Sequence, residues 1–526
     1  MTKRPSSRFP ESAPLPAVIT RREAVQGMLA VAAASLASGC RGSSSSSSSP
    51  TPPPSGNQQP TPSGSVADAS LTVTASAVGT IPPAFAGLSY EKSKINQNPY
   101  LFTGANSNLI GIFKRLGSGI LRIGGNSVDR NTWTTSGTGQ TTGQISPADV
   151  DALAAFVQAA GWKCLYGINL GGAGPNPYTS GSLIATTTPA LAADEIAYAY
   201  LKFGPSLMGF EIGNECDLYG RSYFSGAVWD PPTFESLWSS FRSAIVSRTP
   251  AVASLCTGPA DAGHESSWTV PFGQSVTKSN LSLLTQHYYR ANGADASSTA
   301  QLLISPDSNL ISNLATLDSG ANGIGVPFRM SECNSFYNGG ANGVSDSYAS
   351  SLWVIDFLFD CALGGSEGTN LHGGGNGAGY TPIADSGGAV QEARPEFYGM
   401  LLFTLAGTGM LYKTSLAAGS LNATAYAVKT ASSLNLVVVN KESTQNLKLS
   451  AQLPQAAGSA TLLEMTQGSS GASEPDLAAT NGVTIQGASV GADGSFAPGA
   501  AYELNPRGTS LTCYVPALSA VLIQIT

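Results

Sequence analysis

Two glutamates stand out because each follows a short apolar run. Glu215 closes the stretch LMGFEIGNE (207–215), and Glu332 lies in PFRMSECN (327–334). A buried carboxylate without a partner is costly, so a carboxylate that ends an apolar strand is expected where solvent or a ligand reaches it. Two such groups facing one another can break a glycosidic bond, one donating a proton while the other attacks the anomeric carbon or activates water. A lone strand-end Glu is often only a surface residue, so the pair carries the hypothesis.

Short apolar runs alternate with amphipathic stretches from about residue 81 onward. Glu215 ends the fourth run and Glu332 belongs to the seventh. This alternation predicts a (β/α)8 TIM barrel over 81–404, whose reactive groups lie at the C-terminal ends of the strands. An open, doubly wound sheet is the alternative. The eight strand candidates are 84–90, 120–125, 163–170, 207–215, 253–260, 283–289, 327–334 and 368–374, and helices are expected at 146–161, 188–204, 231–250 and 345–365.

The pattern changes after residue 405. Runs with period-2 alternation, separated by turn residues, predict an antiparallel β-sandwich over 405–526. One early strand, predicted at 67–80 around SLTVTAS, has no obvious place in a parallel barrel. We therefore expect it to cross over and join the C-terminal sheet.

The N-terminal region is predicted to be a targeting segment rather than part of the folded domain. Residues 1–40 combine paired arginines with a short apolar run ending in LASGC, which predicts an export signal, of the twin-arginine type. Cys40 resembles a lipid-attachment cysteine, although Ala37 stands where such signals usually have Leu. Residues 41–66 are rich in Ser and Pro and predict a disordered linker. The expected location is the periplasm or cell surface, with a membrane anchor through Cys40; a plain cleaved signal is the alternative.

Composition argues against several classes of protein. Only 11% of residues are charged and the net charge is −7, whereas a nucleic-acid binder would show a basic face. The three histidines, His264, His287 and His372, lack metal-ligand spacing, and so do the cysteines. No phosphate-binding loop is present, and RIGGNS (122–127) lacks the spaced glycines of a dinucleotide site. The sequence predicts neither a metal ion nor a cofactor.

A family resemblance sharpens the hypothesis. GNE at 213–215 and SECNS at 331–335 resemble the strand-four and strand-seven motifs of clan A retaining glycoside hydrolases. More narrowly, residues 70–526 are similar to glycoside hydrolase family 79, the β-glucuronidase and heparanase-like group. The resemblance implies that Glu215 is the acid/base and Glu332 the nucleophile.

The resemblance also implies roles for neighbouring side chains. Asn214 would hold the substrate 2-hydroxyl, and Tyr288, or alternatively Tyr289, would hydrogen-bond the nucleophile. Apart from the resemblance, a nearby positive charge favours the ionised form of a carboxyl group, so we expect Arg122 or Arg329 to help keep Glu332 ionised. The remaining substrate-binding candidates are two tyrosines expected to read a uronate, Tyr337 and Tyr380, and two residues after the first and second strands, Glu91 and Asn126.

The implied function is a retaining exo-β-glycosidase that hydrolyses β-D-glucuronides, with a carbohydrate as its substrate. One alternative is a clan A β-xylosidase or arabinofuranosidase acting on a neutral sugar. Another is a non-catalytic carbohydrate-binding lipoprotein on the cell surface.

Overall fold

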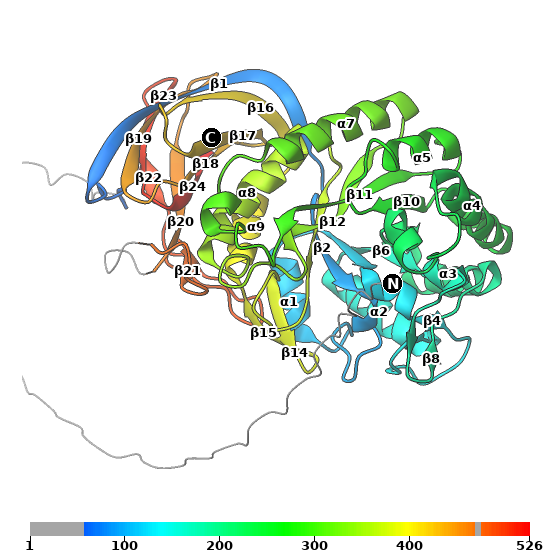
Figure 1. The fold of residues 1–526 in the computed structure, drawn as a ribbon. Coiled ribbons are helices and arrows are strands. Elements are labelled where there is room, and N and C mark those ends of the chain that lie inside the picture. The colour runs from blue at the N-terminus through cyan, green and yellow to red at the C-terminus, as the bar shows by residue number, and fades with distance from the viewer. Residues whose placement is uncertain (1–56, 469–474) are drawn as a thin grey trace, which may run out of the picture. The chain divides into compact units, whose positions relative to one another are not determined.

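The computed structural model describes residues 57–468 and 475–526 (Figure 1). The predicted export signal at 1–40, with Cys40, and the linker up to residue 56 lie outside the described residues. Gln58 already forms a β-bridge with Glu503, and the first strand starts at Ser65, slightly before the predicted 67. In the described part of the chain, no helix is both long and apolar enough to cross a membrane.

Eight parallel strands close into a barrel, in the order β10-β11-β12-β13-β2-β3-β6-β9. Closure confirms the predicted barrel and excludes the open sheet. Their residues are almost all buried, which explains why the runs read as continuous apolar stretches rather than as alternating ones. The strands are β2 (Ala86–Glu91), β3 (Ile120–Gly124), β6 (Lys163–Ile168), β9 (Leu207–Ile212), β10 (Cys256–Asp261), β11 (Leu283–Asn292), β12 (Phe328–Tyr337) and β13 (Thr369–Gly373).

Helices alternate with these strands along the chain, and the four predicted helices are all present. Local capping signals set their starts: Ser146 forms a capping box with Asp149, while Thr188 and Asp230 accept hydrogen bonds from backbone N–H groups in the next turn. The helices are α1 (Ser107–Arg115), α2 (Pro147–Ala160), α3 (Pro189–Phe203), α4 (Pro231–Arg248), α5 (Thr269–Val276), α6 (Ala300–Leu303), α7 (Ser308–Ile324), α8 (Tyr348–Leu363) and α9 (Pro395–Ala406).

A ten-stranded sheet follows the barrel and takes in the N-terminal strand β1 (Ser65–Ile81). β1 lies between β16 and β19, antiparallel to β16 and parallel to β19, so the sheet is mixed rather than purely antiparallel (Figure 1). The other strands are β16 (Gly409–Ala417), β17 (Ala423–Lys429), β18 (Leu434–Asn440), β19 (Gln445–Gln452), β20 (Ala460–Gln467), β21 (Val483–Ile485), β22 (Tyr502–Leu504), β23 (Ser510–Val515) and β24 (Ser519–Ile525).

Strand β18 shows why the sheet and the barrel form one body. Its side chains alternate between two clusters: Val437 and Val439 pack into the core that contains the barrel helices, while Leu436 and Val438 pack inside the curled sheet. Both faces of the strand are thus buried, and its central residues 436–439, LVVV, are apolar without a break. Short hairpins complete the fold: β14 (Ile383–Ser386) with β15 (Ala389–Ala393), and β7 (Thr179–Ser180) with β8 (Leu183–Ile184); β4 (Thr132–Trp133) and β5 (Gln144–Ile145) form a small parallel pair.

Candidate active site

Glu215 lies on a tight turn directly after β9. Gly213 and Glu215 both have positive φ angles, 90° and 51°, which residues other than glycine rarely adopt. Two hydrogen bonds hold the turn: the Glu215 backbone N–H donates to the Ala260 carbonyl (2.7 Å), and the Asn214 N–H donates to the Tyr219 hydroxyl (3.1 Å). Such strain persists where surrounding contacts enforce it, and here it turns Glu215 out of the strand at the C-terminal end of the barrel.

Glu332 lies on β12 and is 6% exposed. Its carboxylate accepts hydrogen bonds from Arg122 Nη1 (2.7 Å) and from the Tyr289 hydroxyl (2.8 Å), and His372 Nδ1 lies 3.7 Å away. Burial alone would raise the pKa of Glu332. The neighbouring imidazoles of His372 and His287, the Arg122 guanidinium and the Tyr289 hydrogen bond together more than offset burial and hold the pKa of Glu332 well below its usual range. Glu332 is therefore ionised at neutral pH.

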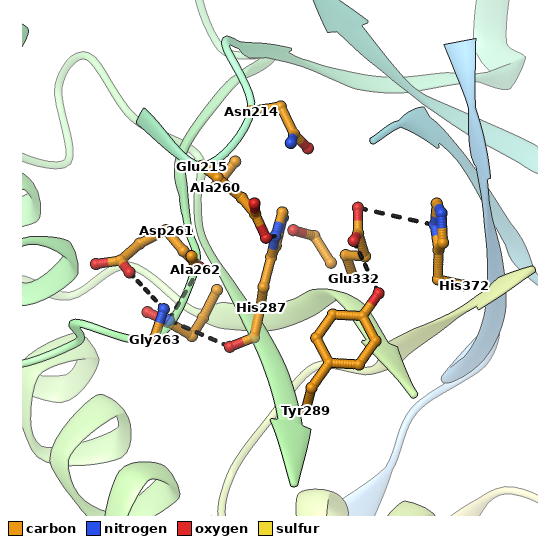
Figure 2. Close-up of polar contacts among 12 residues, drawn as sticks. Asn214, Glu215, Ala260, Asp261, Ala262, Gly263, His287, Tyr289, Glu332 and His372 are labelled. Atoms are coloured by element: carbon orange, nitrogen blue, oxygen red, sulfur yellow. Dashed lines mark hydrogen bonds and ion pairs between the residues drawn. The ribbon is translucent and has the colours of Figure 1, made fainter. Parts of the chain in front are cut away.

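The two glutamates face one another, with His287 between them (Figure 2). One oxygen of Glu215, one oxygen of Glu332 and a ring nitrogen of His287 all lie within 4.8 Å of one another. An oxygen–oxygen separation below 4.8 Å fits the roughly 5–5.5 Å between carboxyl groups in retaining glycosidases better than the roughly 6.5–9.5 Å in inverting enzymes. The side chain of Glu215 is 21% exposed, so one carboxyl group is open to solvent and the other is enclosed.

Arg122 connects most of these groups from inside the barrel, where its side chain is 0% exposed. Besides Glu332, its guanidinium contacts Glu211 (2.6 Å), Asn214 Oδ1 (2.9 Å) and His287 Nε2 (3.1 Å). Because an arginine only donates, His287 Nε2 must accept, which places the ring proton on Nδ1, 3.3 Å from Glu215 Oε1. A single buried cation thus orients both the Asn–Glu turn and Glu332.

Several predicted binding residues gather around this centre. Asn214 is buried beside Arg122, and Tyr380 stacks on Tyr289 with ring centroids 5.7 Å apart. Glu91 Oε2 accepts a hydrogen bond from the Ser127 N–H (2.7 Å), and its other oxygen lies 4.0 Å from His372 Nε2.

Two further candidates lie at or just after the ends of barrel strands, but their side chains are more exposed to solvent than those described above. Asn126 is exposed at the start of a 3-10 turn (Asn126–Arg130) after β3, and Tyr337, the last residue of β12, is 45% exposed. Their substrate contacts stay predictions.

The first choice of Tyr288 as the partner of Glu332 is wrong in the structure, and of the two arginine alternatives only Arg122 contacts Glu332. The Tyr288 hydroxyl donates to Asp307 (2.7 Å), and Tyr289 is the tyrosine that contacts Glu332. Side chains alternate along a strand, so Tyr289 shares the inner face with His287 while Tyr288 packs outward against Phe357. Arg329 does not reach Glu332 either; it is buried and donates to Asn370 and to the backbone carbonyls of Phe85 and Thr369.

Sequence reasoning did not identify two members of the site, Glu211 and His372. Glu211 stands four residues before Glu215, inside the apolar run, and a carboxylate buried in a strand was itself a signal that a buried cation must pair with it. His372 lies on β13, where its Nδ1 also contacts the Ser89 hydroxyl (3.0 Å).

Among the residues that the structure describes, two groups of side chains bring metal-ligating atoms within 4.8 Å of one another. The first is the Glu215–His287–Glu332 centre. The second consists of Asp217 after β9, Asp261 at the end of β10 and His264 in the following loop. In the first group Arg122 already neutralises charge on Glu332. In the second, His264 Nδ1 contacts Asp217 (2.7 Å), and backbone N–H groups donate to both carboxylates.

Known proteins resemble the chain in sequence over part of its length. No protein-family model matches it. A β-glucuronidase of Aspergillus niger is 28% identical over 244 residues, which cover 41% of this chain and 41% of that protein. A β-glucuronidase of Neurospora crassa is 25% identical over 264 residues, covering 45% of each. The chain thus matches less than half the length of these curated relatives.

Solved structures match almost the whole described fold. A 4-O-α-L-rhamnosyl-β-D-glucuronidase from Fusarium oxysporum, 17% identical, aligns with a TM-score of 0.66 over 86% of this chain and 99% of its own. A family 51 arabinofuranosidase from Xanthomonas axonopodis, 14% identical, aligns with a TM-score of 0.60 over 87% of this chain and 100% of its own. The chain is thus similar to β-glucuronidases over part of its length and shares the fold of solved glycoside hydrolases, which supports a glycoside hydrolase of the family 79 type.

Proposed function

We propose that the chain is a retaining exo-β-glycosidase that hydrolyses β-D-glucuronides. The observation that carries the proposal is the pair of carboxyl groups at the C-terminal end of one barrel, within 4.8 Å of each other and differing in environment. Glu332 is buried, ionised and held by Arg122 and Tyr289, as a nucleophile requires. The similarity to two β-glucuronidases supports a glucuronide as the substrate.

The reaction follows as a double displacement. An oxygen of Glu332 attacks the anomeric carbon while the bond to the aglycone oxygen breaks, and the proton on Glu215 moves to that oxygen. Glu332 is then an ester of the sugar and Glu215 is a carboxylate. Water attacks the anomeric carbon, Glu215 takes its proton, and the bond to Glu332 breaks, which restores both groups.

Individual residues have distinct tasks in this scheme. His287 Nδ1–H donates to Glu215 Oε1, so the transferable proton belongs on the other oxygen, Oε2. Asn214, whose Oδ1 is fixed by Arg122, presents its amide to the sugar 2-hydroxyl, a contact that strengthens as the ring flattens. Tyr380 and Tyr337 are assigned to the uronate carboxylate, and Glu91 and Asn126 to other hydroxyls.

A panel of aryl glycosides tests the proposal. An aryl β-glucuronide should be the best substrate, and NMR of the first product should show the β-anomer. Glu332→Gln should abolish turnover while the protein stays folded, as circular dichroism would show. Full activity of Glu332→Gln, or an α-anomer as first product, would end the assignment.

A neutral sugar is the second candidate substrate, because the fold also matches an arabinofuranosidase. Faster hydrolysis of an aryl β-xyloside or α-arabinofuranoside than of the glucuronide would favour it. A non-catalytic sugar-binding protein would release no product from any member of the panel.

We also propose that the protein is exported and anchored to a membrane through a lipid on Cys40. Support comes from the arginine pair, the apolar run and the Ser/Pro-rich segment of the sequence. Metabolic labelling with a radioactive fatty acid should mark the wild-type protein and leave Cys40→Ser unlabelled. Equal labelling of both would refute the anchor.

A further inference from the structure

We propose that Glu211 is a positioning residue whose charge balances Arg122 while Glu332 is esterified. The proposal rests on the proposed function, because it assumes that Glu332 forms the covalent intermediate. Glu211 does not touch the reacting atoms; it acts through Arg122.

Both carboxylate oxygens of Glu211 have hydrogen-bond partners inside the barrel. Its side chain is 1% exposed, and Oε2 lies 2.7 Å from Arg122 Nε and 2.6 Å from Arg122 Nη2. The other oxygen, Oε1, accepts a hydrogen bond from the Ser331 hydroxyl (3.1 Å). Glu211 therefore fixes the guanidinium from behind, and this leaves the remaining N–H groups directed at Glu332, Asn214 and His287.

The charges of this cluster change during the reaction. In the free enzyme, one cation on Arg122 stands between two carboxylates, Glu211 and Glu332. When Glu332 becomes an ester its charge disappears, and Arg122 keeps one counter-ion only because Glu211 is present. Without Glu211 the buried arginine of the intermediate would have no carboxylate in contact with it, because Glu215 reaches it only through His287, and this is strongly unfavourable at 0% exposure.

Because Glu332 loses its charge in one step and regains it in the other, Glu211 should affect ester formation and ester hydrolysis differently. Removing the charge of Glu211 should oppose formation of the ester, because that step consumes the last anion beside Arg122. It should not oppose hydrolysis of the ester, because that step regenerates the Glu332 carboxylate. A residue that only stabilises the barrel would slow both steps or neither.

Glu211→Gln tests this, with an aryl glycoside that the wild-type enzyme hydrolyses. The value of kcat/KM, which reports ester formation, should fall about 100-fold or more, as expected for loss of one partner of a buried pair. The rate of reactivation of the 2-deoxy-2-fluoro glycosyl-enzyme, which reports ester hydrolysis, should stay the same or rise. Reactivation slowed as much as kcat/KM would overturn the proposal, and so would an unchanged kcat/KM.

Glu396→Gln is the matched control. Glu396 is also a buried glutamate, 1% exposed, but it lies in the first turn of α9 and its partner is Asn334 and not Arg122. At pH 6 this variant should retain both rates. If Glu211→Gln fails to fold, Ser331→Ala replaces it: losing the hydrogen bond to Glu211 should lower kcat/KM by roughly 3- to 10-fold without slowing reactivation. Slowed reactivation, or no change in kcat/KM, would overturn the proposal.

Peptide mapping of the fluorosugar adduct separates this proposal from the proposed function. An adduct on Glu332 with slow reactivation in Glu211→Gln rejects only the role of Glu211. An adduct on another residue rejects the nucleophile assignment and, with it, the premise of the inference.

Discussion

Two adjacent tyrosines on β11 offer a sharp test of the site, because only one of them faces Glu332. Tyr289→Phe removes one hydroxyl, which lies 2.8 Å from Glu332 Oε1, and leaves a ring that can still stack on Tyr380. A hydrogen bond to a charged group contributes about 1.5–3 kcal/mol, which corresponds to a loss of about 10- to 150-fold in kcat/KM. Arg122 still holds the other oxygen, so some activity should remain.

The same change should alter the pH dependence of the reaction. The Tyr289 hydroxyl is one of the groups that lower the pKa of Glu332, so its removal raises this pKa. The glycosylation step needs the carboxylate, and the acid limb of the kcat/KM profile should therefore move to higher pH. The assay is a pH series of initial rates with an aryl glucuronide, or with the best substrate of the panel.

Tyr288→Phe is the control from the neighbouring position. It removes a hydroxyl that donates to Asp307, the N-cap of α7, so it should cost about 1 kcal/mol in the free energy of unfolding and leave the pH profile unchanged. Equal loss of activity in both variants would refute the reasoning, as would a Tyr289→Phe profile with an unmoved acid limb.

Three further predictions concern stability and specificity. Burial raises the pKa of Glu396 to about 8. The stability contributed by its protonated form is therefore complete below about pH 4.5 and is lost as pH rises through about 8. Glu396→Gln should unfold at a higher temperature than wild type at pH 9 but not at pH 4. Lys441→Ala breaks a largely buried pair with Asp356, between the sheet and α8, and should lower the free energy of unfolding by about 3–5 kcal/mol in urea titrations. Tyr380→Phe and Tyr337→Phe should raise KM for an aryl glucuronide by about 10-fold and leave that for a neutral glycoside unchanged, if these hydroxyls bind the uronate; equal changes for both substrates would contradict this.

The barrel was predictable because its strands carry a strong signal. A fully buried parallel strand is a short apolar run, and eight such runs separated by helix starts such as Ser146 and Asp230 allow few folds. The same pattern placed Glu215 and Glu332 on the fourth and seventh strand candidates, although β12 continues to Tyr337, five residues past Glu332. What the pattern does not contain is register: β11 shifts its pairing with β12 between Gln286 and His287, and a shift of one residue exchanges the inner and outer faces. The choice between Tyr288 and Tyr289 depends on that register.

The buried charges were harder to predict for a different reason. Arg122 was one of two candidates for pairing with Glu332, and nothing in a single strand distinguishes it from Arg329. The structure separates them by position: Arg122 reaches Glu211 and Glu332, whereas Arg329 donates to backbone carbonyls such as those of Phe85 and Thr369. Ion pairs between side chains on distant strands form only when the barrel closes, so no local segment of the sequence predicts them.

The position of strand β1 between two C-terminal strands affects both how the chain can be truncated and when its sheet can form. Seventeen residues from one end of the described chain sit between β16 and β19, which come more than three hundred residues later. A fragment cut at the end of the barrel would therefore leave two unsatisfied strand edges in the middle of its sheet, where other chains could add. During synthesis, too, β1 must wait for the last quarter of the polypeptide before it finds either neighbour, so the long-range pairing that seals the sheet forms late.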